Sequence, residues 1–150
     1  MNVSGKKLFI KLKLTYCFAT FIAFMGGVFI YAFFRNTSNM ALFSFLPKPS
    51  FLNNTVLLRT ESIWVCMFIY NLPYGLWCIS GLLFVRAVWM NNEKWRKIYS
   101  VIFITLVMIY VLLKIPGIIP GTFDVLDLVF MGFFAFIESL IFKMFIRRYL

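Results

Sequence analysis

Hydrophobic residues gather in four long runs along the chain, and short polar segments separate these runs. The first run, residues 14–34, contains no charged residue. A helix of about 20 apolar residues is long enough to cross a hydrocarbon core of about 30 Å. The run therefore predicts a transmembrane helix, and the later runs predict further transmembrane helices over about 67–88, 96–114 and 124–143.

The second run has two interpretations, because the sequence YNLPYG interrupts it at Pro73. Proline costs a helix interior about 3 kcal/mol but suits the first turn of a helix. Either the span begins at Pro73 and residues 63–72 approach the bilayer separately, or one kinked helix covers both parts. The preceding loop, residues 36–62, is rich in apolar and aromatic residues. We therefore expect an interfacial or re-entrant segment in this first outward loop.

The composition agrees with an integral membrane protein. Hydrophobic residues make up 63% of the chain and charged residues 13%, whereas soluble domains average about 45–50% and about 25%. The length of 150 residues allows one compact domain. We predict a single all-α membrane domain, residues 1–150.

The basic residues set the expected orientation of the spans. The net charge is +10, and eleven of the fifteen Lys and Arg residues fall at the N-terminus, between residues 86 and 97, or in the C-terminal tail. Cytoplasmic loops carry an excess of Lys and Arg, so both termini are expected in the cytoplasm. The lysines before the first run resemble those of a signal peptide, but the run exceeds an apolar signal region of about 7–15 residues. We expect an uncleaved anchor.

The residue types argue against several kinds of chemistry. The chain has no histidine, which removes Ser-His-Asp, Cys-His and His-metal sites. Its three cysteines form no CxxC pair and lie in apolar contexts, as inert thiols usually do. The sequence shows no cofactor-binding or nucleic-acid-binding motif. We therefore predict a non-enzymatic protein with no cofactor, no metal and no nucleic-acid partner.

The segment IPGTFDVLDLVF, residues 119–130, places Asp124 and Asp127 at the start of the fourth run. Asp124 fits the N-cap and Asp127 the third helical position, where carboxylates favour the positive end of the helix dipole. Phe123 and Leu128 fit a hydrophobic staple. These carboxylates therefore predict a helix cap at the membrane interface.

The same two acids also form a candidate polar site. Residues three apart share a helix face, so Asp124 and Asp127 could grip a basic group or, with water, a divalent cation. Arg35, which ends the first run, is the expected basic partner, and Arg59 and Lys114 lie near the same outward plane. Pairing would join the first and fourth spans, or the group could bind an anionic lipid head group.

Glu138 is the acid expected deepest in the membrane. Ionisable groups at depth usually face the bundle interior and have a partner. Arg86, at the inner end of the second span, and Lys143 are the candidate partners. We predict an intramembrane ion pair, Glu138 with Arg86, or a proton kept on the acid, rather than a transport or proton-relay role.

The segments GTFDVLDLVFMGFFAF and NLPYGLWCISGLLFVRAVW, with Arg35 after the first helix, resemble the VanZ-like family of small bacterial membrane proteins. Asp124 and Asp127 match the acidic motif that opens the last helix of the family. The chain departs from the family at Tyr74, where an Asp is expected, and in its third helix, which lacks the expected Glu and Gln. The resemblance implies a bacterial cytoplasmic (inner) membrane protein of the cell envelope, linked to tolerance of the glycopeptide teicoplanin.

Three functions remain open at this point. The first is a VanZ-like envelope protein that binds a lipid or lipophilic envelope component at an outward site around Asp124, Asp127 and Arg35. The second is a non-catalytic membrane subunit that packs on a partner protein. The third is a small transporter or intramembrane enzyme that uses Asp127 and Glu138, and the absence of a histidine and of an internal repeat argues against it.

Overall fold

The computed structural model describes residues 3–34, 62–119 and 123–149. Within these ranges the regular elements are four α-helices: α1 (Val3–Phe34), α3 (Ile63–Val88), α4 (Glu93–Leu112) and α5 (Val125–Tyr149). Each is long and apolar enough to cross a membrane, over Phe9–Tyr31, Ile63–Val88, Glu93–Leu112 and Val125–Met144. For the described residues, the prediction of an all-α protein with four candidate membrane spans is confirmed, which suggests a multi-pass membrane protein.

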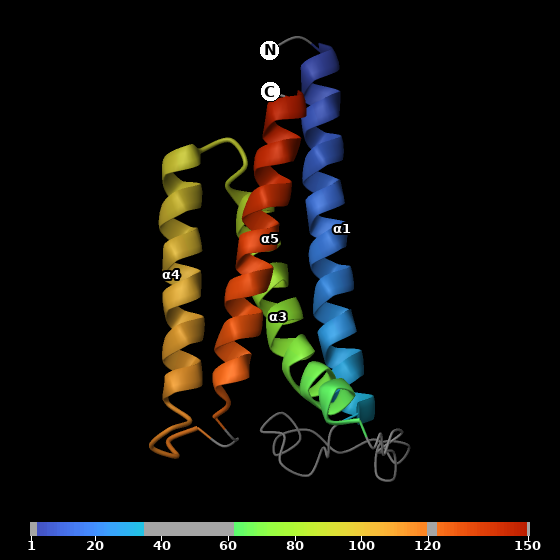
Figure 1. Cartoon of the computed structure of the whole chain (residues 1–150). Coiled ribbons are helices and arrows are strands. Elements are labelled where there is room, and N and C mark those ends of the chain that lie inside the picture. The colour runs from blue at the N-terminus through green and yellow to red at the C-terminus, as the bar shows by residue number, and fades with distance from the viewer. Residues whose placement is uncertain (1–2, 35–61, 120–122, 150) are drawn as a thin grey trace, which may run out of the picture.

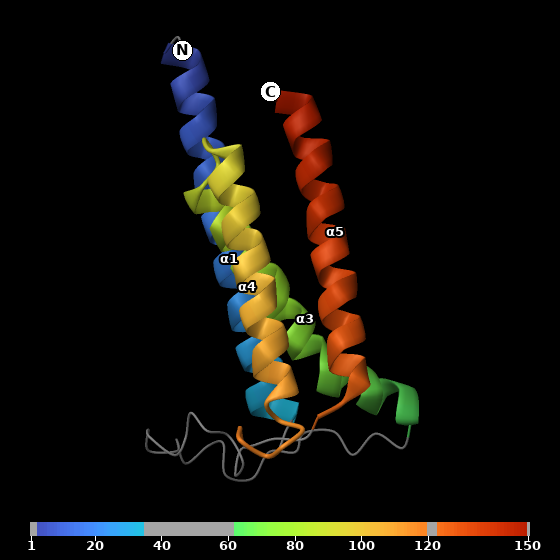
Figure 2. The ribbon, with the colours of Figure 1, turned by 90° about the vertical axis from the view of Figure 1, so that its left-hand side faces the viewer.

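The four helices run up and down along a common direction (Figure 1). The first described turn of α1, the end of α5 and the α3–α4 turn lie at one end, which we call the termini end. The α4–α5 turn lies at the opposite end. Helix α3 packs against each of the other three helices, whereas α4 and α5 make few contacts with each other (Figures 1 and 2). Helix α3 is therefore the central helix of the bundle.

Helix α3 continues through Pro73, which is buried inside it. Residues 63–72 thus form the first part of α3, and the interpretation in which they approach the bilayer separately is wrong. The neighbouring Asn71 is also buried, and its side-chain Nδ2 donates a hydrogen bond to the Met67 carbonyl oxygen at 2.7 Å. This local bond satisfies a polar group that would otherwise be costly inside a membrane. The rest of the expected interfacial segment, residues 36–61, lies outside the described residues.

Glycines let aromatic rings from neighbouring helices approach α3 closely. A Cβ added at Gly75 would collide with the Phe134 ring of α5, and one added at Gly81 would collide with the Phe103 ring of α4. On α1, a Cβ at Gly27 would collide with the Trp77 indole of α3. Small residues at helix interfaces serve this purpose in membranes, where close packing rather than water exclusion holds helices together.

Helix α4 begins three residues before the predicted span, at Glu93. Asn92 provides the reason, because its side-chain Oδ1 accepts a hydrogen bond from the Trp95 backbone N–H at 3.2 Å and so caps the helix. At the other end of α4, the chain turns toward α5 through Gly117, whose φ of 73° suits glycine. This turn places Lys114 close to the start of α5.

Candidate functional site

The two aspartates at the start of α5 have different surroundings. Asp124 is exposed, and its Oδ1 accepts a hydrogen bond from the Leu126 backbone N–H at 2.9 Å, as a cap does. Asp127 is only 3% exposed and lies within the first turn of α5. Phe123 and Leu128 both pack against the buried core cluster. Asp124 thus caps the start of α5 with an exposed side chain, whereas the Asp127 side chain points into the protein interior.

The buried carboxylate of Asp127 faces Lys114, which follows α4. Lys114 Nζ lies 3.8 Å from Asp127 Oδ2, and both side chains are almost fully buried. The ammonium group also donates a hydrogen bond to the Tyr74 hydroxyl at 2.6 Å and lies 4.2 Å from the centre of the Tyr74 ring. We call Lys114, Asp127 and Tyr74 the Lys114 site. It joins α3, the α4–α5 turn and α5 in one polar cluster.

The Lys114 site differs from the polar site expected from the sequence. Asp127 belongs to both, but Asp124 is exposed and does not join it. Arg35 lies outside the described residues. The sequence placed Lys114 near this plane but did not single out Tyr74 as its partner. The sequence indicated only weakly that Lys114 would contact Tyr74 and Asp127. Lys114 is one lysine at the end of an apolar run, and Tyr74 lies 40 residues before it and Asp127 13 residues after it.

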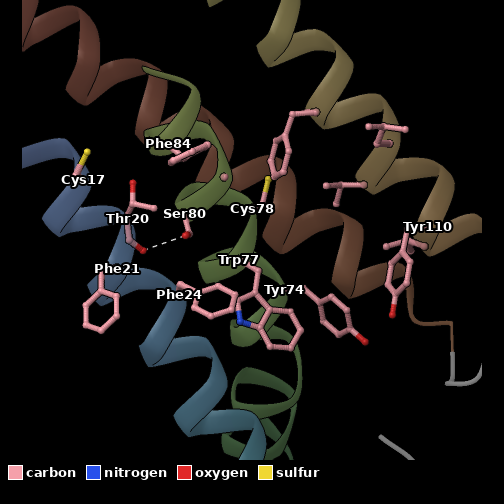
Figure 3. A pocket seen from close by; sticks show the side chains of 15 residues that line it. Cys17, Thr20, Phe21, Phe24, Tyr74, Trp77, Cys78, Ser80, Phe84 and Tyr110 are labelled. Carbon is pink, nitrogen blue, oxygen red and sulfur yellow. Dashed lines mark hydrogen bonds between the residues drawn. The ribbon is translucent and has the colours of Figure 1, made fainter. Parts of the chain in front are cut away.

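An apolar groove of about 830 Å³ lies between α1, α3 and α4. Figure 3 shows Cys17, Thr20, Phe21 and Phe24 on the α1 side and Tyr110 on the α4 side. The α3 residues that line it run from Tyr74 to Phe84, which at about 1.5 Å per residue gives a length of about 15 Å. The described parts of α1 and α4 pack mainly on α3 rather than on each other, and the groove is the space between α1 and α4.

The groove and the Lys114 site meet at two tyrosines. Tyr74 and Tyr110 both line the groove. Lys114 Nζ lies 4.2 Å from the centre of the Tyr74 ring and 5.6 Å from that of Tyr110. At its end nearest the α4–α5 turn, the apolar groove is therefore bounded by two tyrosines that lie against the buried Lys114 ammonium. An amphipathic molecule, which has an apolar body and a polar end, matches this division of the groove.

One hydrogen bond joins the α1 and α3 walls of the groove. The Ser80 hydroxyl donates a hydrogen bond to the Thr20 carbonyl oxygen at 3.0 Å, shown as a dashed line in Figure 3. Hydroxyls that bond across helices in this way are common where spans pack tightly. This bond fixes α1 against α3, so two walls of the groove are held in place independently of α4.

Glu138 and Arg86 form an ion pair far from the Lys114 site, nearer the termini end. Arg86 Nε donates to Glu138 Oε1 at 2.9 Å, and Arg86 Nη2 donates to Glu138 Oε2 at 3.0 Å. The Glu138 side chain is fully buried and that of Arg86 is 13% exposed. Of the two candidate partners for Glu138, the structure pairs it with Arg86. This geometry describes a structural tie between α3 and α5.

The described residues contain no group of three or more Cys, Asp or Glu side chains placed to hold a metal ion. Comparison of the chain with protein-family models, with curated proteins and with solved structures gives no match. The resemblance to the VanZ-like family therefore stays a prediction.

Proposed function

We propose that this protein holds a lipid or another lipophilic molecule in the groove between α1, α3 and α4. The polar end of that molecule would lie against the Lys114 site. The observation that carries the proposal is that Tyr74 and Tyr110, which line an apolar groove of about 830 Å³, lie against the buried ammonium of Lys114.

The apolar body of the ligand fits the groove lining and its surroundings. The lining is almost entirely aromatic and aliphatic, with Phe21, Phe24 and Phe103 among its rings. The groove belongs to helices long and apolar enough to span a bilayer. A space open to hydrocarbon is filled by acyl chains rather than by water, because water there would lack hydrogen-bond partners. Its length of about 15 Å is about half of a hydrocarbon core of about 30 Å.

The polar end of the ligand follows from the charges of the Lys114 site. Among the described residues of the site, Lys114 and Asp127 carry opposite charges. The Lys114–Asp127 distance of 3.8 Å is longer than a good hydrogen bond, which has a donor–acceptor distance of about 2.7–3.2 Å. Such a pair suits a ligand group that accepts a hydrogen bond from the ammonium, such as an ester or hydroxyl oxygen. A hydroxylated or esterified lipid is the ligand class that we propose.

The first experiment identifies what occupies the groove. We would purify the protein in a mild detergent and measure bound small molecules by native mass spectrometry. The matched variants are Leu106→Trp, which fills the groove, and Ile109→Trp, which adds the same indole on the same helix outside the groove lining. The proposal expects a lipophilic adduct on wild type and on Ile109→Trp, and its loss from Leu106→Trp.

Two results would count against the proposal. An adduct retained equally by both tryptophan variants would place the molecule outside the groove. A stoichiometric protein that co-purifies with wild type and is lost from Leu106→Trp would mean that a partner helix fills the groove. That second result would favour the alternative of a non-catalytic subunit.

The cellular setting rests on the sequence alone. We propose a bacterial cytoplasmic membrane, with both termini in the cytoplasm, from the distribution of Lys and Arg and the resemblance to the VanZ-like family. A role in the envelope and in teicoplanin tolerance is proposed from that resemblance only. It is tested by measuring teicoplanin susceptibility in a Gram-positive host that expresses wild type, Asp127→Asn or Asp124→Asn at matched membrane levels. Reduced susceptibility with wild type and Asp124→Asn, but not with Asp127→Asn, supports it, and no shift with any of them contradicts it.

A further inference from the structure

A second, smaller pocket lies at the termini end of the bundle, apart from the groove. It has a volume of about 270 Å³ and lies between the end of α3, the start of α4 and the last part of α5. Its polar lining residues are Arg86, Glu93, Arg96, Lys97, Ser139 and Lys143. We call it the basic pocket. None of its residues lines the groove.

The charges of the basic pocket do not balance. Four of its lining residues are cations, and the acids that face them are Glu93, which pairs with Lys97 at 2.8 Å, and the buried Glu138, which pairs with Arg86. Among the residues that the structure describes, two positive charges are left over, those of Arg96 and Lys143. A pocket with excess positive charge next to hydrocarbon favours an anion.

Arg96 is the residue that points most directly to a ligand. It is 8% exposed, and one of its terminal nitrogens donates to the Met90 carbonyl oxygen at 3.2 Å. Its Nε is buried and has no hydrogen-bond partner among the described residues. Buried donors on charged groups are normally paired, because water can no longer satisfy them. An anion in the pocket that Arg96 lines would place acceptor oxygens beside this under-satisfied guanidinium.

The two arginines of the basic pocket are held in place by an aromatic ring. The Arg86 guanidinium carbon lies 4.1 Å, and that of Arg96 4.7 Å, from the centre of the Phe142 ring. Arg86 is further fixed by its two hydrogen bonds to Glu138. Two like charges are thus brought to one ring, where Glu138 offsets part of their repulsion and an anion in the pocket would offset more of it.

The position of the basic pocket indicates which anion it meets. Trp89, Trp95 and Tyr99 cluster at the same end, and the Trp89 and Tyr99 rings stack with centres 4.9 Å apart. Tryptophan and tyrosine gather at the membrane–water interface, at the depth of lipid headgroups. The pocket volume of about 270 Å³ is well above the roughly 10–15 Å³ that a single water molecule needs, so a larger polar group fits.

We propose that the basic pocket binds the headgroup phosphate of an anionic phospholipid from the leaflet at the termini end. The guanidinium of Arg96 and the ammonium of Lys143 supply its charge-assisted hydrogen bonds, and Ser139 supplies a hydroxyl. Basic pockets between membrane helices recognise anionic headgroups by this chemistry. The site does not depend on the proposed function, because it shares no residue with the groove or with the Lys114 site.

The test measures lipid binding to delipidated protein by native mass spectrometry. Phosphatidylglycerol is the anionic probe and phosphatidylcholine the zwitterionic one, and inorganic phosphate is added separately as a competitor. The variants are Lys143→Gln and Arg96→Gln. The matched control is Lys94→Gln, which removes a charge from the same turn of α4 as Arg96 but outside the pocket. Lys143 is exposed, so its variant is expected to fold even if the Arg96 variant does not.

The proposal expects wild type and Lys94→Gln to prefer phosphatidylglycerol, and Lys143→Gln to lose about fivefold in affinity for it, the usual effect of one basic residue near a membrane surface. Equal losses in Lys143→Gln and Lys94→Gln would overturn it, because the charge of the whole surface would then explain binding. Displacement of phosphatidylglycerol by an equal concentration of inorganic phosphate would also overturn the lipid assignment and make free phosphate the ligand.

Discussion

Arg86 and Glu138 lie 52 residues apart in the chain and meet through two parallel hydrogen bonds of 2.9 and 3.0 Å. This arrangement uses both oxygens of a carboxylate and the planar fork of a guanidinium, which is the strongest form of such a pair. The side chain of Glu138 is fully buried, so removing Arg86 would leave a buried carboxylate without its counter-charge. The pair therefore fixes the register of α3 against α5.

The first prediction concerns this pair. Glu138→Gln should lower the unfolding free energy by about 3–5 kcal/mol, because it leaves a largely buried guanidinium without its counter-charge. The double variant Arg86→Met with Glu138→Leu should recover most of that loss. Thermal unfolding in detergent micelles measures both. Glu93→Gln is the control, since its pair with Lys97 is exposed and should leave the melting temperature unchanged. Additive losses in the double variant would contradict the prediction.

The second prediction concerns Tyr74 and Lys114. Tyr74→Phe keeps the ring but removes the hydroxyl that accepts the Lys114 hydrogen bond. A hydrogen bond to a charged group contributes about 1.5–3 kcal/mol, so a loss of that order is expected in the unfolding free energy. Tyr99→Phe is the control, because Tyr99 is exposed and its ring still stacks on Trp89. Equal effects of the two substitutions would show that the Lys114 hydrogen bond contributes little.

The third prediction tests the close approach of the helices. Gly75→Ala forces the Phe134 ring to move, and overpacking of this kind typically costs about 1–3 kcal/mol. Gly132→Ala makes the same change on α5, where the added methyl group meets nothing within 4 Å. Alanine has the higher helix propensity, so Gly132→Ala should be neutral or stabilising by up to about 1 kcal/mol. Melting temperatures of the two variants give the comparison, and a loss in Gly132→Ala as large as that in Gly75→Ala would refute this account of the packing.

The approximate positions of the four candidate spans in the described residues could be predicted from the sequence, because they follow from the lengths of apolar runs, which are local. The boundaries were less accurate where a single cap decides them, as Asn92 does at the start of α4. The interpretation in which the second span begins at Pro73 was wrong, because packing of the bundle outweighs the free-energy cost of one proline inside α3. Asp127 could be found from its position at the helix start, whereas its contact with Lys114 depends on how α4 and α5 pair.

The basic pocket shows a different limit of sequence reasoning. Arg96 and Lys143 each fit a basic membrane flank, and the distribution of charge explains both without a site. Only the meeting of α3, α4 and α5 brings them together beside Phe142. Long-range packing of this kind leaves no pattern along the chain.

The fourth prediction concerns the orientation that we propose. Reporter fusions that are active only in the cytoplasm should be active at both termini, because the four candidate spans of the described residues, an even number, return the chain to the side on which it began. Fusions that are active only outside should be active in the α4–α5 turn, after Gly117. The reverse pattern at all three positions would invert the topology, and a difference between the two termini would contradict the four-span arrangement.

The most direct test of the groove is photo-crosslinking with a lipid that carries a diazirine on its acyl chain, followed by peptide mapping in wild type, Leu106→Trp and Ile109→Trp. The proposal predicts that labels concentrate on the residues of α1, α3 and α4 that line the groove, including Phe21, Phe84 and Phe103. It also predicts that Leu106→Trp removes these labels and that Ile109→Trp does not. Labels spread evenly over the exposed apolar residues of all four helices, unchanged by Leu106→Trp, would contradict the proposal that the groove holds a lipid.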